Sequence, residues 1–214
     1  MAGNSQEANM WYNRGRYFSD AGDYDRAAYC FGRALEQNPE DLRAWKRRGF
    51  ALLKLHRYDE SAACYDRVLA LAPEDAASWQ RKGFLCAKMH RFDEALACSD
   101  RSLRINPSSV TALHTRGWVL VVERRYDEAV QCYDRILEID PDRDFARRNR
   151  EAILAHKAFR KLAADVSEAE KVVAIPPFIY EVLGTRDYSG IDRACKVLSR
   201  LLVDRKPESA PRMK

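Results

Sequence analysis

The sequence predicts an all-α solenoid, because a single structural unit recurs along most of the chain. Its clearest marker is a proline every 34 residues, at Pro39, Pro73, Pro107 and Pro141. Glycine and aromatic residues keep the same spacing, at Gly15, Gly49, Gly83 and Gly117 and at Tyr24, Tyr58, Phe92 and Tyr126. Periods of about 20 to 50 residues are typical of repeat proteins, whose units bury their apolar faces against one another.

Each unit is expected to form two helices, as the first unit illustrates. One face of its first helix carries, at helical spacing, Trp11, Gly15 and Phe18. A turn follows at Gly22, and Asp25 is a favourable N-cap for the second helix. The inner face of that second helix carries Ala27, Phe31 and Ala34. Pro39 ends the unit, because the residue before a proline is pushed out of helical geometry.

These positions resemble the tetratricopeptide repeat motif, which reads W-x2-L-G-x2-Y, then A-x3-F, then P, over 34 residues. The resemblance covers residues 8–141. It implies a right-handed α-solenoid of four helix hairpins, at residues 8–41, 42–75, 76–109 and 110–143. Two departures are local, because Ser61 replaces the small alanine of the second unit and Ser99 replaces the aromatic residue of the third. The second helix of the third unit should therefore pack less tightly.

The flanking segments break the repeat pattern. The sequence predicts a capping helix with an outward polar face after the array, which keeps a solenoid soluble. A further C-terminal helical segment with an amphipathic face follows, and this face could pair two copies of the chain. The predicted segments are an N-terminal tail at 1–7, the capping helix at 144–171, an apolar proline-rich linker at 172–177, a degenerate helical hairpin at 178–206 and a flexible tail at 207–214.

Composition and cysteine placement favour a cytoplasmic protein without a cofactor or a metal site. The 214 residues are 46% hydrophobic and 32% charged, they contain no long apolar run, and they start without a secretory pattern. Four cysteines recur at one unit position, at Cys30, Cys64, Cys98 and Cys132. Equivalent positions of stacked helices lie about 8–10 Å apart, too far for a disulfide. No cysteine or histidine cluster has zinc-site spacing, so we expect buried, reduced packing residues.

In the tetratricopeptide repeat fold the first helices line a concave groove, and the resemblance implies that unit positions 2, 5, 6, 9, 12 and 13 face inward. These positions hold seven cations and one anion, although residues 1–141 contain 21 basic and 21 acidic side chains. Compensating acids such as Asp59 and Glu60 begin the second helices, where they complement the helix dipole. The candidate groove residues are Tyr12, Asn13, Arg16, Arg43, Lys46, Arg47, Phe50, Gln80, Arg81, Phe84, Lys88, His114 and Trp118.

The sequence therefore predicts a non-catalytic interaction scaffold or adaptor that binds an extended acidic or carboxylate-ended peptide of a protein partner. Asn13, Arg43 and Arg47 match three of the five positions of the carboxylate clamp that some family members use. Aromatic side chains and arginine forks suit such a ligand. A simpler interpretation is that the aromatic residues pack between adjacent first helices and the cations are merely solvated.

Nucleic-acid binding and catalysis are the two alternative classes of function. Nucleic-acid binding, to RNA above all, would use the basic groove and residues 142–214, which hold 16 basic and 11 acidic side chains. An enzyme is not expected, because the sequence has no GxSxG, glycine-rich phosphate loop or HExxH motif. No catalytic residue is assigned, and His56 and His90 recur at one turn position where a surface role is expected.

Overall fold

The computed structural model describes residues 2–169. The chain divides into two compact units, Met1–Pro141 and Asp142–Lys214. The expected linker at 172–177, helical hairpin at 178–206 and tail at 207–214 lie outside the described residues. The part of the chain that is described contains helices and no strand.

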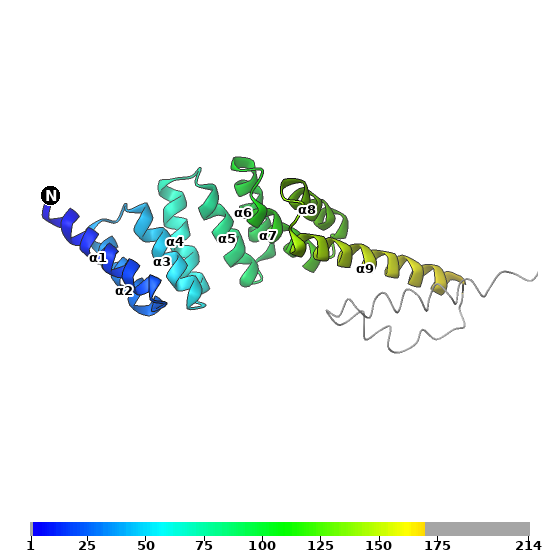
Figure 1. Ribbon diagram of the computed structural model, residues 1–214, viewed down its shortest axis with the longest axis horizontal. Helices are drawn as coiled ribbons and strands as arrows, with labels where there is room; N and C mark the ends of the chain where they lie inside the picture. Colours follow the sequence, from blue (N-terminus) through cyan, green and yellow to red (C-terminus); the bar gives the residue numbers. More distant parts are fainter. Residues whose placement is uncertain (1, 170–214) are drawn as a thin grey trace, which may run out of the picture. The chain divides into compact units, whose positions relative to one another are not determined.

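The first unit is a row of four helix hairpins, which confirms the predicted α-solenoid (Figure 1). Its helices are α1 (Ala2–Asp20), α2 (Tyr24–Gln37), α3 (Leu42–Lys54), α4 (Tyr58–Leu71), α5 (Ala76–Lys88), α6 (Phe92–Ile105), α7 (Val110–Val122) and α8 (Tyr126–Ile139). Each helix contacts the next one along the chain, and α5 also contacts α7. The second unit contributes α9 (Asp144–Ala169), which falls within the range expected for a capping helix.

Two local expectations about the first hairpin are wrong. Helix α1 begins at Ala2, so residues 2–7 are helical and do not form an N-terminal tail. The N-cap of α2 is Asp23 and not Asp25, because the Asp23 carboxylate accepts a hydrogen bond from the backbone N–H of Arg26 at 3.1 Å. Asp25 lies in the first turn of α2, where its charge still complements the helix dipole.

The turn inside every hairpin uses the left-handed region of backbone conformation at the same unit position. Its φ angles are 78° at Gly22, 59° at His56 and His90, and 61° at Arg124. Only glycine adopts this conformation without a steric penalty. The two histidines are therefore part of a structural turn, in which His90 packs edge-on against Phe92 at 5.6 Å between ring centroids.

Within each hairpin the two helices approach closely at a glycine. A Cβ atom at Gly49 would lie 2.9 Å from Cε2 of Tyr65. In the third hairpin the nearest atom to such a Cβ at Gly83 is Oγ of Ser99, at 3.1 Å, because the aromatic side chain is missing there. The hairpins thus share one backbone geometry and differ in the side chain that fills the gap.

Successive hairpins are joined by small buried residues and by a repeated tryptophan hydrogen bond. Ala44 and Ala51 of α3 are fully buried. Nε1 of Trp45 donates to the carbonyl of Pro39 at 2.8 Å, and Nε1 of Trp79 donates to that of Pro73 at 2.7 Å. The proline that ends one unit therefore holds the first helix of the next.

The cysteines of the repeat are buried, as the sequence predicts. Their thiols are reduced in the structure, and the buried set among the described residues is Cys30, Cys64, Cys86, Cys98 and Cys132. Burial raises the pKa of the Cys64 thiol to about 11. Such a thiol stays protonated and unreactive near neutral pH, which agrees with a packing role.

We expect Gly49→Ala to lower the free energy of unfolding by about 1–3 kcal/mol, because the Tyr65 ring is buried and cannot move away from the new methyl group. Gly83→Ala is the matched control and should cost less, because the Ser99 hydroxyl is smaller than a ring. Urea denaturation of both variants measures the difference. An equal loss of stability would show that the aromatic filler does not set the helix spacing.

Candidate functional site

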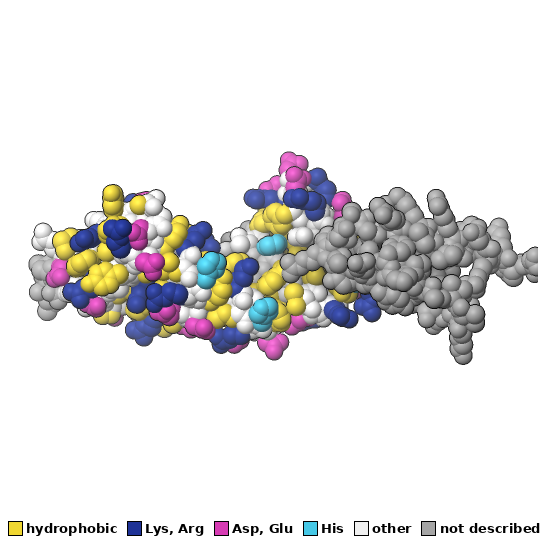
Figure 2. Space-filling view, turned by 90° about the horizontal axis from the view of Figure 1, so that it is seen from below, with side chains coloured by type: hydrophobic (Ala, Val, Ile, Leu, Met, Phe, Trp, Pro, Cys, Tyr) yellow, Lys and Arg dark blue, Asp and Glu magenta, His cyan; other side chains and the backbone are white. Residues whose placement is uncertain are grey.

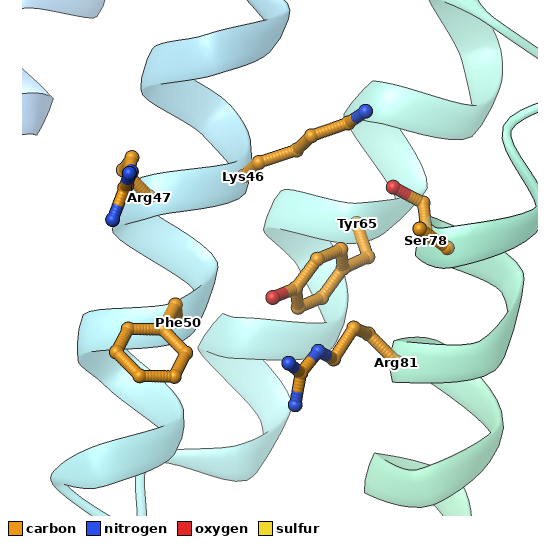
Figure 3. Close-up of a pocket in the computed structure, with 7 residues that line it drawn as sticks. Lys46, Arg47, Phe50, Tyr65, Ser78 and Arg81 are labelled. Carbon is orange, nitrogen blue, oxygen red and sulfur yellow. The ribbon is translucent and has the colours of Figure 1, made fainter. Parts of the chain in front are cut away.

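A pocket of about 300 Å³ lies between the first helices of the second and third hairpins, and we call it the α3–α5 pocket (Figure 3). It brings together four of the thirteen predicted groove residues with three others. The lining residues are Lys46, Arg47, Phe50, Tyr65, Ala77, Ser78 and Arg81. The pocket is therefore the place where the predicted cations and rings meet.

Two aromatic rings form the apolar wall of the α3–α5 pocket. Phe50 is half-buried, and its ring packs edge-on against Tyr24 of the preceding hairpin at 6.2 Å between centroids. Tyr65 from α4 is buried. Burial raises the pKa of Tyr65 to about 12, so its hydroxyl keeps its proton near neutral pH and can donate a hydrogen bond.

Two arginines of the α3–α5 pocket carry charge that no carboxylate neutralises. Arg47 and Arg81 are exposed and form no ion pair with any residue of the described chain. Cζ of Arg81 lies 5.9 Å from the centroid of the Phe50 ring, within cation–π range. Figure 3 shows the Arg81 side chain extending from α5 toward the two rings.

Lys46, the third cation of the pocket, is not free. Its Nζ lies 2.8 Å from Oδ1 of Asp75, the N-cap of α5. Burial of Asp75 opposes its ionisation, but hydrogen bonds from Lys46 and Ser78 outweigh burial and hold the pKa of Asp75 below its usual value. Lys46 therefore fastens one hairpin to the next.

A second cluster of predicted residues lies on α5 and α7. Nζ of Lys88 lies 5.4 Å from the Phe84 ring centroid and 5.8 Å from that of Trp118. Trp118 also packs edge-on against Phe92 at 6.5 Å. Phe84 and Trp118 are half-buried, and the ring neighbour of Trp118 lies on the second helix α6, whereas the simpler interpretation of the sequence expects packing between adjacent first helices.

The predicted residues on α1 and at the start of α3 contribute less than the sequence suggests. Arg43 lies over the Tyr12 ring at 4.9 Å, but it pairs with Asp41 at 3.0 Å. Its charge is therefore already neutralised. Asn13 and Arg16 are exposed on α1. Of the three clamp residues, only Asn13 and Arg47 are thus available to a ligand.

Gln80 and His114 are held by protein neighbours. Oε1 of Gln80 accepts from the Ser109 hydroxyl at 3.3 Å. His114 packs against the buried Tyr133, with 6.3 Å between ring centroids. Burial lowers the pKa of His114, so the imidazole is neutral near pH 7 and adds no charge to the groove.

Arginines at the starts of the second helices differ from those of the α3–α5 pocket, because they are paired with an acid of the same helix start. Arg57 forms a two-bond fork with Glu60 at 2.6 Å, and Arg91 and Glu94 form a similar one at 2.7 and 2.8 Å. The face in Figure 2 shows Lys and Arg side chains mixed with acidic and hydrophobic ones. Unpaired positive charge is thus concentrated on the first helices.

Residues 2–169 show neither a metal centre nor a membrane-crossing helix. Within this range, no three His, Cys, Asp or Glu side chains gather where they could ligate a metal. None of the described helices is both long and apolar enough to span a bilayer.

Comparisons with known proteins identify the repeat. The sequence patterns of the tetratricopeptide repeat family match residues 12–76 and 85–154. The chain belongs to the tetratricopeptide repeat family. Proteins of this family are generally interaction scaffolds. No curated protein sequence matches the chain.

Solved structures with the same fold are similar at low sequence identity. A MamA protein aligns with a TM-score of 0.67 at 14% identity, covering 96% of this chain and 99% of its own. YrrB, described as a tetratricopeptide repeat protein with an unusual peptide-binding site, aligns at 0.63 and 22% identity, covering 67% and 74%. The first repeat domain of Spaghetti (RPAP3), bound to the HSP90 peptide SRMEEVD, aligns at 0.54 and 19%, covering 56% and 95%.

Asp75→Asn should lower the free energy of unfolding by about 0.5–1 kcal/mol near pH 7, because it removes the charged partner of Lys46 while an asparagine can still cap α5. The folded-state pKa of Asp75 is lower than its unfolded value of 3.8. Its contribution is therefore complete above the unfolded pKa and is lost as the pH falls through the folded pKa.

Urea denaturation at several pH values tests this dependence. The difference between wild type and Asp75→Asn should shrink below about pH 4. Asp59→Asn, an acid in the first turn of α4, is the control and should cost less at neutral pH. A difference for Asp75→Asn that stays constant down to about pH 3 would contradict the assigned ion pair.

Proposed function

We propose that this protein is a non-catalytic scaffold that binds an extended acidic segment of a partner protein along the first helices α3, α5 and α7. The observation that carries the proposal is the α3–α5 pocket, in which the unpaired Arg47 and Arg81 flank an apolar wall. A guanidinium group binds a carboxylate through two parallel hydrogen bonds, and it does so most strongly where no other acid competes.

The chemistry of the pocket suits an acidic side chain with an apolar neighbour. The half-buried Phe50 offers ring surface that a partner residue can bury, while Arg47 and Arg81 meet its charge. Because Arg43 is already paired with Asp41, we favour acidic side chains over a terminal carboxylate as the main contact.

The solved neighbours support a peptide ligand without defining it. The repeat domain of Spaghetti (RPAP3) is bound to the peptide SRMEEVD, which contains three acidic residues, and YrrB has a peptide-binding site. Both lie below 25% identity to this chain, so they support only the use of this fold for binding extended peptides.

RNA binding, the alternative from the sequence, is less well supported. Nucleobases stack on open aromatic faces. The Phe50 ring already contacts Tyr24, Lys54 and Arg81. Stacking a base there would displace these neighbours, whereas a peptide carboxylate can reach the arginines without moving the ring.

A cytoplasmic location of the protein stays a prediction.

Selection from a random heptapeptide library tests the proposed ligand class. Bound peptides should be enriched in Asp and Glu, and Arg81→Glu should weaken the selected peptides about tenfold or more, because a charge-assisted contact is lost. Arg104→Glu on α6 makes the same charge change at another exposed position and should alter affinity less than about twofold. Enrichment of basic peptides, or an equal effect of the two variants, would contradict the proposal.

Titration of the same proteins with a single-stranded oligonucleotide separates the two ligand classes. The proposal expects no binding at about 50 mM salt. Oligonucleotide binding that falls steeply with salt and is lost in Arg81→Glu would instead assign the α3–α5 pocket to nucleic acid.

A further inference from the structure

A second pocket, of about 470 Å³, lies between the two helices of the second hairpin, and we call it the α3–α4 pocket. It shares no lining residue with the α3–α5 pocket. Its lining residues are Trp45, Arg48, Leu52, Glu60, Ala63, Cys64, Asp66 and Arg67. Trp45 is fixed in place by its hydrogen bond to the carbonyl of Pro39.

The two acids that line the α3–α4 pocket form ion pairs with cations that do not line it, whereas the two arginines that line it form no ion pair. Glu60 is held by Arg57 at 2.6 Å, and Asp66 pairs with Lys82 at 2.5 Å. Arg48 and Arg67 form no ion pair with any described residue. Their Cζ atoms lie 6.0 and 5.9 Å from the centroid of one Trp45 ring system. The pocket therefore presents two arginines without an ion-pair partner, although the Glu60 carboxylate, whose pKa is lowered mainly by its hydrogen bond from Arg57, is close enough to Arg48 for the Arg48 charge to lower that pKa as well.

The repeat shows which group Arg48 lacks. Lys82 of the third hairpin and Arg116 of the fourth occupy the same unit position as Arg48. Lys82 pairs with Asp66 of the preceding hairpin, and Nε of Arg116 donates to Oδ1 of Asp100 at 2.8 Å. Each of these cations thus has an acid in the hairpin before it.

The residue of the first hairpin that corresponds to Asp66 and Asp100 is Gly32. A Cβ atom at Gly32 would lie 3.7 to 3.9 Å from the guanidinium atoms of Arg48, which leaves ordinary contact distance for a side chain. Nε of Arg48 is buried and makes no hydrogen bond. Of Arg48, Lys82 and Arg116, the cations at this position in the second to fourth hairpins, only Arg48 therefore lacks a carboxylate partner in the preceding hairpin.

The first hairpin explains why the α3–α4 pocket is open. The unit position of Ala63 is occupied there by Tyr29, whose ring packs edge-on against Trp11 at 6.2 Å. In the second hairpin the small Ala63 leaves the corresponding tryptophan, Trp45, uncovered on that side. The second hairpin thus combines an uncovered face of Trp45 with the unpaired Arg48.

We propose that the α3–α4 pocket binds an acidic side chain of a partner protein, whose carboxylate pairs with Arg48 as Asp100 pairs with Arg116. Arg67 adds a second positive charge. The methylene groups of the incoming Glu or Asp pack against Leu52 and the Trp45 ring. This site is independent of the α3–α5 pocket, and it would give a partner a second point of attachment on the same hairpin.

The test is an NMR titration of the intact protein with sodium propionate as the smallest probe, against sodium chloride at equal ionic strength. The side-chain Nε–H signal of Arg48 and the indole Nε1–H signal of Trp45 report on this pocket alone. Propionate should shift both signals in a saturable way, and chloride should not. Absence of a saturable Arg48 shift in wild type overturns the proposal.

Gly32→Asp supplies the missing carboxylate within the chain and should abolish the propionate response of Arg48. Gly32→Asn has nearly the same size without the charge, and it should keep the response. Far-UV circular dichroism establishes that both variants are folded. A propionate response in Gly32→Asp equal to that of wild type contradicts the pairing of the ligand with Arg48.

A third arm separates an acidic protein segment from a free small carboxylate. A glutamate heptapeptide should bind the pocket at least tenfold more tightly than propionate when measured in Arg47→Glu/Arg81→Glu, in which the α3–α5 pocket is blocked. Equal affinity for the peptide and propionate would overturn the assignment to a protein partner. Loss of library binding at the α3–α5 pocket leaves these readouts unchanged, so the two proposals fail separately.

Discussion

The array depends on the close approach of the two helices of each hairpin at Gly15, Gly49, Gly83 and Gly117. No Cβ fits at Gly15 or Gly49 without moving a buried ring, so the helix spacing there is set by backbone against aromatic side chain. The spacing in turn fixes which faces remain for the neighbouring hairpins, where small residues such as Ala44 and Ala51 are fully buried. Because every hairpin presents the same faces, a side chain that departs from the repeat changes one local contact and leaves the architecture intact.

The pairing of charged side chains also repeats from hairpin to hairpin. At the starts of the second helices, arginines are forked to glutamates of the same turn, as in Arg57–Glu60. Between hairpins, cations such as Arg116 pair with the acid of the preceding unit. The cations that remain without an acid include Arg47 and Arg81 in the α3–α5 pocket and Arg48 in the α3–α4 pocket. A neutral array can therefore present localised positive charge, because pairing is decided position by position along the unit.

The 34-residue period was enough to predict the hairpins, because each unit repeats one apolar pattern. The site was only partly predictable. Asp41 neutralises Arg43 of the unit that follows it, and Asp75 neutralises Lys46 of its own unit, so considering each first helix alone overestimated its free charge. Tyr65 is not among the predicted groove residues, because it lies on a second helix, yet it lines the α3–α5 pocket. A signal for Arg48 was present in the sequence, since Gly32 interrupts the series that Asp66 and Asp100 continue.

The central claim is that the unpaired cations of the first helices mark the surface a partner contacts. Backbone amide NMR shifts of the array on addition of a selected acidic heptapeptide measure this most directly. We predict that the largest shifts fall on α3 and α5 around Arg47, Phe50 and Arg81, and that α6 and α8 change little. Shifts concentrated on α6 and α8, whose helix-start arginines are already paired, would contradict the claim.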